Sequence, residues 1–297
     1  MTRSFVAPTS IDEALSALAG GARIVAGGTD LVVGARQGKA PLPDSLLAIH
    51  RIEELRGVST PPDGGLHLGT LATHEEIVGN PVVLEHFTAL ADASAIVGSH
   101  ATRAQGTIGG NVMNASPAMD TGGPLLCFDA TATLRSARRE RTVSLDELWT
   151  GPGSTSASHD ELLVAIDVPA HAAGTGSCYV RLEYRRHMEI AVVGATAVVT
   201  LDAGTVTDAR IAITALSPTI RRVPDAETAI VSSGDVSEAA KLTAAASSPI
   251  DDVRGSVAYR RAMAEVIARR AISSAIARAR GEFVPMPASP ALHGATS

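Results

Sequence analysis

The chain has 297 residues, of which 45% are hydrophobic and 19% charged, and its formal net charge is −6. This apolar content can bury a core, which excludes a disordered protein, and the length predicts about two domains. The negative charge and the 3% aromatic content argue against a nucleic-acid-binding surface. No signal peptide and no membrane span of about eighteen apolar residues is recognisable, so we expect a cytoplasmic protein.

The two cysteines, Cys127 and Cys178, are too few for an iron–sulfur cluster, a four-cysteine zinc site or a disulfide framework within this chain. We expect Cys127, in the apolar stretch that follows Pro124, to be a buried thiol. The histidines have no metal-ligand spacing, so we assign neither a metal site nor, from the residues alone, a catalytic group.

The first part of the chain predicts a small unit of two strands and two helices. Ser10 as N-cap and Glu13 at position N3 are typical of a capping box. The predicted elements are a helix over 12–19, a strand over 22–26, a helix over 29–36 and a strand over 46–49.

A second part begins after a proline- and glycine-rich loop at 61–65. Its predicted elements are a strand over 66–68, a helix over 73–78, a long helix over 82–97 and strands over 125–134, 141–144 and 162–168. Between them, 99–123 is rich in Asn, Thr and Gly, and we interpret it as an ordered functional loop.

The third part changes to alternating strands followed by helices. We expect antiparallel strands over 177–183, 190–201 and 209–216, then helices over 226–231, 236–246 and 253–280. The last helix carries Arg269, Arg270, Arg278 and Arg280. We interpret this basic face as solvated, with contact to an acidic partner subunit as the alternative.

The first candidate binding motif is Gly27-Gly28-Thr29, between a strand and a helix. Glycines let a ligand approach the backbone, and the free N–H groups at a helix start attract an anion such as phosphate. The alternative is a plain strand–helix turn with Thr29 as N-cap.

The second candidate motif runs from Thr107 through Gly109-Gly110-Asn111 to Asp120. Its Thr and Asn side chains can donate to phosphate oxygens, and Asp120 can accept hydrogen bonds from sugar or ribityl hydroxyls. The alternative is a loop in which Asn114 and Asp120 form Asx-turns. Neither motif is a Walker A loop or a Gly-x-Gly-x-x-Gly fingerprint.

Three segments together resemble the FAD-binding subunit of molybdenum hydroxylases, the group of the carbon monoxide dehydrogenase medium subunit and the xanthine dehydrogenase FAD domain. They are AGGTDL at 26–31, TIGGNVMNASPAMD at 107–120 and YRRHMEIAVVGATAVV at 184–199. The resemblance covers roughly residues 1–285. It implies an α+β fold, with a vanillyl-alcohol-oxidase-type FAD-binding domain in two subdomains and a smaller C-terminal α+β domain of antiparallel sheet and helices. The implied boundaries are 1–57, 58–176 and 177–284, followed by a flexible tail at 285–297.

The resemblance also implies how FAD is bound: the two glycine turns wrap the pyrophosphate, the adenine side lies near Arg23, and Asp120 contacts flavin or ribose hydroxyls. The basic position near the flavin is Arg185 or Arg186, and Asp30, which would repel phosphates if it pointed inward, is expected to point to the helix face or to a hydroxyl. The implied cofactor-binding positions are Arg23, Ile24, Val25, Ala26, Gly27, Gly28, Thr29, Asp30, Leu31, Ala104, Gly106, Thr107, Ile108, Gly109, Gly110, Asn111, Asn114, Ser116, Asp120 and Arg186.

By the same resemblance the chain is an electron-transfer subunit without acid–base groups of its own. A large subunit with molybdopterin cofactor and a small subunit with two [2Fe-2S] clusters are the implied partners, in a dimer of heterotrimers. The flavin passes electrons to an external acceptor, which is NAD, a quinone or another carrier. The alternatives are a free-standing FAD-dependent oxidoreductase and a non-enzymatic FAD-binding module. The small aromatic content of 177–285, with Tyr179 and Tyr184, argues against a separate substrate site.

Overall fold

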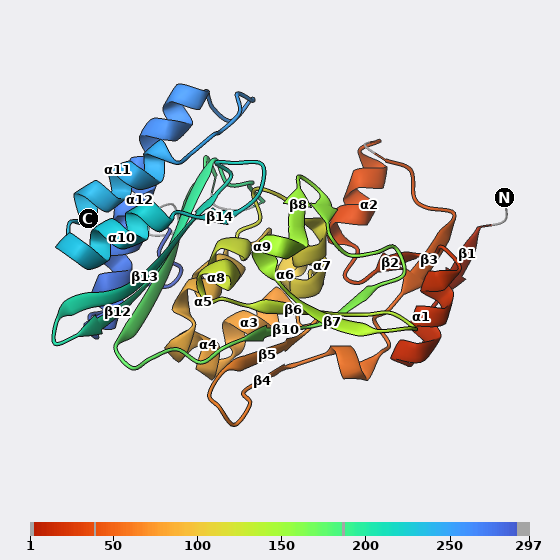
Figure 1. Ribbon diagram of the computed structural model, residues 1–297. Coiled ribbons are helices and arrows are strands. Elements are labelled where there is room, and N and C mark those ends of the chain that lie inside the picture. The colour runs from red at the N-terminus through yellow and green to blue at the C-terminus, as the bar shows by residue number, and fades with distance from the viewer. Residues whose placement is uncertain (1–2, 39, 186–187, 290–297) are drawn as a thin grey trace.

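The computed structural model describes residues 3–38, 40–185 and 188–289. Three units follow one another along the chain, and Figure 1 shows them from the N-terminal unit (red) through a central unit to the C-terminal unit (blue). Each unit is built on its own main sheet, and two of the three hydrophobic clusters extend from one unit into the next. The mixed α+β architecture agrees with the expected fold class.

The N-terminal unit is a three-stranded parallel sheet in the order β1-β3-β2. Its elements are β1 (Ser4–Val6), α1 (Ile11–Ala19), β2 (Arg23–Val25), α2 (Thr29–Arg36) and β3 (Ser45–Ala48). Ser10 caps α1 by accepting from the N–H of Glu13 at 3.3 Å, as predicted. The Glu13 carboxylate bonds the N–H of Thr9, one residue before the cap, at 3.0 Å. Helix α2 contributes no buried residue to the core and projects from the body of the molecule (Figure 1).

The central unit is built on a five-stranded sheet in the order β4-β5-β10-β6-β7. Its elements are η1 (Glu53–Leu55), β4 (Val58–Ser59), β5 (Leu66–Gly69), α3 (His74–Gly79), α4 (Pro81–His86), α5 (Thr88–Ala95), α6 (His100–Arg103), α7 (Ile108–Asn114), α8 (Gly122–Cys127), β6 (Thr131–Arg135), β7 (Glu140–Ser144), α9 (Leu145–Leu148), β8 (Trp149–Gly151), β9 (Ser154–Thr155) and β10 (Leu162–Val168).

The structure corrects three predictions in this unit. The helix expected over 82–97 is two helices, because the backbone breaks at the fully buried Phe87. The stretch 99–123, expected to be a loop, contains α6, α7 and the first residues of α8. Side chains of Ser99 and Thr107 cap the first two. The strand expected over 125–134 begins only at Thr131. All residues of α8 are buried, so the helix has no polar face. Its sequence therefore shows no helical periodicity that would distinguish it from a buried strand.

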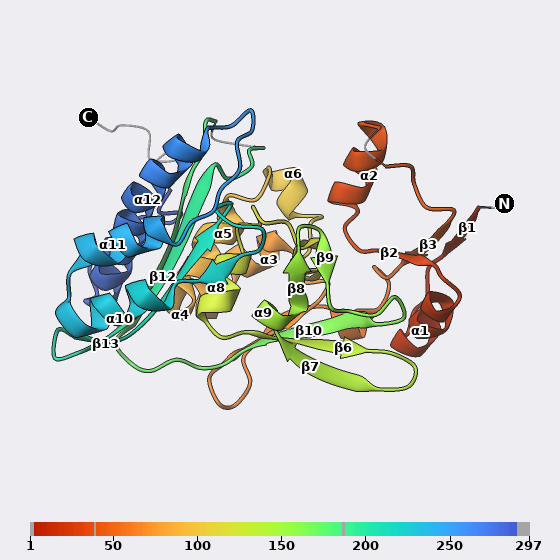
Figure 2. The same ribbon diagram turned by 45° about the horizontal axis from the view of Figure 1, so that its top comes forward.

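The C-terminal unit is an antiparallel sheet in the order β11-β12-β13-β14, followed by three helices. Its elements are β11 (Thr175–Leu182), β12 (Val193–Asp202), β13 (Thr205–Thr214), β14 (Arg221–Arg222), α10 (Pro224–Ser233), α11 (Val236–Ala245) and α12 (Val257–Ala279). Figure 2 shows the three helices over the outer face of this sheet, while α5 and α8 of the central unit pack on its inner face. In the described part of the chain, no helix combines the length and apolar character needed to span a bilayer.

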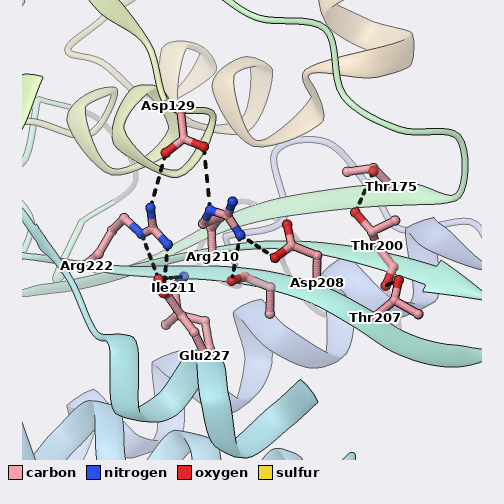
Figure 3. Close-up of polar contacts among 10 residues, drawn as sticks. Asp129, Thr175, Thr200, Thr207, Asp208, Arg210, Ile211, Arg222 and Glu227 are labelled. Atoms are coloured by element: carbon pink, nitrogen blue, oxygen red, sulfur yellow. Dashed lines mark hydrogen bonds and ion pairs between the residues drawn. The ribbon is translucent and has the colours of Figure 1, made fainter. Parts of the chain in front are cut away.

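Aspartates of the central unit pair with arginines of the C-terminal unit across this junction. Asp92 is paired with Arg278 at 2.6 Å and Asp120 with Arg181 at 2.7 Å. In the third contact, Asp129 meets Arg222 at 3.2 Å and Arg210 at 3.5 Å, and Figure 3 shows both guanidinium groups turned toward it. The interpretation of a solvated basic face is therefore wrong for Arg278, whose side chain is only 8% exposed.

Candidate functional site

The first glycine turn joins β2 to α2. Gly28 is the N-cap of α2 and has φ +69°, a conformation that favours glycine over other residues. A Cβ on Gly27 would lie 1.8 Å from the carbonyl oxygen of Gln105, so this position needs glycine because another segment approaches it. The N-cap is Gly28, and Thr29 is the first residue of the helix.

This turn presents backbone donors to a ligand. Among the described residues, no acceptor is bonded to the N–H groups of residues 28–31. Four N–H groups at the start of a helix, together with the positive end of its dipole, favour a bound anion.

The second glycine turn offers side chains in place of backbone donors, because its N–H groups are already bonded. Ile108 and Gly109 donate to the carbonyl oxygens of Ala72 and Thr70 at 2.8 and 3.0 Å. Gly110 and Asn111 donate to the side chain and carbonyl of Thr107, at 3.0 and 2.9 Å.

The side chains of this turn are placed to donate. The hydroxyl of Thr107 accepts from Gly110, so its own proton remains for another acceptor. Asn111 accepts from Thr121 at 2.6 Å through Oδ1, and its Nδ2 has no bond to the described residues. The two glycines differ: a Cβ on Gly109 would lie 1.8 Å from Thr70 Oγ1, whereas Gly110 is exposed.

The two turns lie together at one cavity. Asn114 Nδ2 donates to Asp30 Oδ2 at 3.0 Å in an exposed contact between the two motifs. The cavity has a volume of about 360 Å³. Its lining comes from both motifs and from the segment between β3 and α3: Ala26, Gly27, His50, Arg56, Leu71, Thr73, Ala104, Gln105 and Thr107.

The other predicted positions surround these turns. Arg23 is exposed, and Ile24 and Val25 are half-buried on β2. Gly106 lies behind the second turn, with its carbonyl bonded to the N–H of His74 at 3.1 Å. Ser116 accepts from the N–H of Ala118 at 3.3 Å in a local turn.

Arg185 and Arg186 are the two predicted alternatives for the basic position near the flavin. Arg186 lies outside the described residues. Arg185 is exposed, and its Nε lies 3.2 Å from the carboxylate of Glu189.

Asp120 is buried and bonded within the chain. It accepts from Tyr179 Oη at 2.6 Å and from Arg181 Nη1 at 2.7 Å. Arg181, fully buried, also bonds Glu183. Burial raises the pKa of Asp120, and the Arg181 guanidinium opposes that rise. Sequence reasoning missed Arg181. The signal that could have identified it is a charged residue within the apolar run of strand β11.

His74 is a second residue that the sequence did not single out. It is 1% exposed, and its Nδ1 has no partner among the described residues. Burial, with a smaller contribution from the charge of Arg103, lowers the pKa of His74 to about 4. A neutral histidine therefore lies directly behind Gly106, whose hypothetical Cβ would be 3.4 Å from His74 Cδ2.

Comparison with known proteins gives two family matches that together cover most of the chain. Residues 1–171 match the FAD binding domain in molybdopterin dehydrogenase, and residues 179–275 match the CO dehydrogenase flavoprotein C-terminal domain. The carbon monoxide dehydrogenase medium chain of Hydrogenophaga pseudoflava is 31% identical over 279 residues, which is 92% of this chain and 96% of that protein. The xanthine dehydrogenase FAD-binding subunit of Escherichia coli O157:H7 is 29% identical over 269 residues, covering 88% and 91%.

Solved structures agree with these matches. The carbon monoxide dehydrogenase of Hydrogenophaga pseudoflava that lacks the Mo-pyranopterin moiety superposes with a TM-score of 0.88 at 31% identity, covering 94% of this chain and 98% of the other. Quinoline 2-oxidoreductase from Pseudomonas putida 86 gives a TM-score of 0.86 at 26% identity, with the same coverage.

Proposed function

The chain belongs to the family of FAD-binding subunits of molybdenum hydroxylases, and we propose that it binds FAD between its two glycine turns and transfers electrons within such a complex. Its partners in this proposal are a large molybdopterin subunit and a small subunit with two [2Fe-2S] clusters. The flavin exchanges electrons between those clusters and an external acceptor.

The observation that carries this proposal is that one cavity is lined by Gly27 of the first motif and Thr107 of the second, and that the two motifs offer different donors. The first turn presents the unbonded N–H groups of residues 28–31, and the second presents the Thr107 hydroxyl and the Asn111 amide. A diphosphate needs many donors spread around it, and donors from two sides meet that need. The residues present therefore fit the pyrophosphate of FAD.

Bound FAD would supply reversible one- and two-electron chemistry, and the protein would bind and orient it. The 28–31 backbone and Asn111 hold phosphate oxygens in this account. In the same proposal Asp120, which accepts hydrogen bonds from Tyr179 and Arg181, would hold a hydroxyl of the cofactor. The remaining predicted cofactor positions are part of the same proposal, and no acid–base residue is assigned.

A glycine substitution tests the binding part. Gly110 is exposed, with only Thr107 Oγ1 near a hypothetical Cβ, at 3.0 Å, so a valine there should fold but obstruct the phosphates. Gly79, with nothing within 4 Å of a Cβ, is the matched control. We expect Gly110→Val to lose bound FAD and Gly79→Val to retain it, with thermal unfolding confirming that both fold. Full FAD occupancy in a folded Gly110→Val variant contradicts the placement.

Co-expression tests the subunit part. The chain is expressed with a molybdopterin subunit and an iron–sulfur subunit encoded beside it, and the complex is separated by size. We expect the three chains to migrate together and substrate to bleach the flavin absorbance. A chain that carries FAD but migrates alone is a free-standing flavoprotein or a binding module, and the electron-transfer proposal then fails.

A further inference from the structure

The wall of the cavity between the two turns contains a permanently charged cation, Arg56. Among the described residues that line this cavity it is the only arginine or lysine, and the only other titratable residue is His50. The rest of the lining is apolar or carries neutral polar groups. Arg56 belongs to neither glycine motif, and it follows η1 immediately.

The backbone of Arg56 is held firmly. Leu55 beside it is fully buried and accepts the N–H of Leu71 at 2.7 Å. A Cβ on Gly69 would lie 2.5 and 2.7 Å from the carbonyl oxygens of Leu55 and Arg56, so β5 packs directly against this segment. The start of the Arg56 side chain is therefore fixed at the cavity wall.

The guanidinium of Arg56 is only partly engaged. Nη2 donates to the carbonyl of His50, and Nε lies 3.5 Å from the carboxylate of Glu53, whose side chain is 83% exposed. No bond from Nη1 to the described residues exists, and the side chain is 42% exposed. Arg56 can therefore offer donors to a ligand without breaking a buried ion pair.

A diphosphate in this cavity needs a counter-charge. The donors of the two turns are neutral, and the first turn of α2 carries the acid Asp30. Another nearby cation, Arg103, bonds the carbonyl of Val97 at 3.2 Å and lies 3.6 Å from Glu75. An arginine presents a planar fork of donors that suits phosphate oxygens.

We propose that Arg56 is the cation that binds the diphosphate of the cofactor, an inference that rests on the proposed FAD site. Its role is to bind and neutralise phosphate, and it takes no part in electron transfer.

The test measures FAD affinity of the apoprotein by fluorescence quenching, for wild type, Arg56→Gln, Arg56→Lys and the control Arg51→Gln. Arg51 is exposed, forms no hydrogen bond or ion pair with the described residues and does not line the cavity. Because a hydrogen bond to a charged group contributes about 1.5–3 kcal/mol, we expect Arg56→Gln to raise the Kd for FAD roughly 10- to 100-fold. Arg56→Lys, which keeps the positive charge without the planar fork, should recover part of the affinity, and Arg51→Gln should change it less than twofold.

Salt separates a charge effect from a structural one. The difference between wild type and Arg56→Gln should shrink at high salt, because ions screen an exposed pair. A Kd for Arg56→Gln within twofold of wild type at low salt overturns the inference, as does a loss that lysine fails to restore or that salt leaves unchanged. FAD binding by the wild-type apoprotein keeps the proposed function intact in each of these cases, whereas wild-type apoprotein that fails to bind FAD refutes both.

Discussion

Asp30 and Asn114 are 84 residues apart, and the Asn114 amide donates to the Asp30 carboxylate at 3.0 Å. The bond joins the first turn of α2 to the end of α7, and so ties the two glycine motifs together at their outer edge. It also explains how an acid can stand next to the turn that we propose to bind phosphate. The carboxylate is engaged by a neutral donor within the protein.

The close approach of Gly27 to Gln105 predicts that the smallest possible side chain disrupts the site. In Gly27→Ala, the Cβ would lie 1.8 Å from a backbone oxygen, so the two turns must move apart. We expect about 1–3 kcal/mol of lost stability, measured by urea unfolding, and weaker FAD binding.

Gly34, inside α2 and with nothing within 4 Å of a Cβ, is the control. Gly34→Ala should stabilise the protein by about 0.5–1 kcal/mol, because alanine favours the helix. Equal effects of the two substitutions would be inconsistent with the packing described.

The buried ion pair between Asp92 and Arg278 predicts that replacing the arginine alone costs more stability than replacing both residues. Asp92 is fully buried and also accepts the N–H groups of Tyr179 and Ala288, at 3.1 and 3.0 Å. Arg278→Met leaves that carboxylate without its counter-charge, and we expect a loss of about 3–5 kcal/mol in the free energy of unfolding.

The double variant Asp92→Asn/Arg278→Met should be more stable than Arg278→Met alone, because the amide carries no charge and still accepts a hydrogen bond. Arg269→Met on the same helix removes an exposed pair with Glu265 and should cost about 1 kcal/mol or less. If the Arg269 and Arg278 variants lose equal stability, the Asp92 pair does not hold the units together.

The lowered pKa of His74 predicts a pH-dependent stability. Burial lowers this pKa from 6.5 to about 4. Between these pH values, the unfolded chain binds a proton at His74 and the folded chain does not, so the free energy of unfolding falls as the pH drops from about 6.5 to 4. Above pH 6.5 the side chain is neutral in both states and contributes no pH dependence.

His74→Gln removes this titration. Relative to wild type, the variant should gain about 3 kcal/mol between pH 7 and pH 4, read from urea unfolding at each pH. His159→Gln, at an exposed position, is the matched control for the substitution itself. A stability difference between His74→Gln and wild type that stays constant over this range would mean that His74 titrates normally in the folded protein.

Much of the architecture could be predicted from local patterns. Ser10 predicts the start of α1, the strand predicted over 162–168 coincides with β10, and the glycine pair at 27–28 predicts the turn between β2 and α2. These features depend on short-range signals, namely caps, alternation and glycine pairs, which a single sequence carries.

The remaining features depend on packing partners that the sequence does not display. Helix α8 reads as a strand because burial on every side removes its periodicity. Arg278 reads as a surface residue because Asp92 is 186 positions away. Arg56 has no motif around it, and only the fold brings it to the wall that Gly27 and Thr107 share.

The cofactor content of the chain tests the central claim most directly. The protein is purified, incubated with excess FAD and desalted, and the nucleotide released by heat is identified by chromatography and counted against protein. We predict one FAD for each chain, released without covalent attachment. A chain that retains no flavin after this treatment would contradict the account.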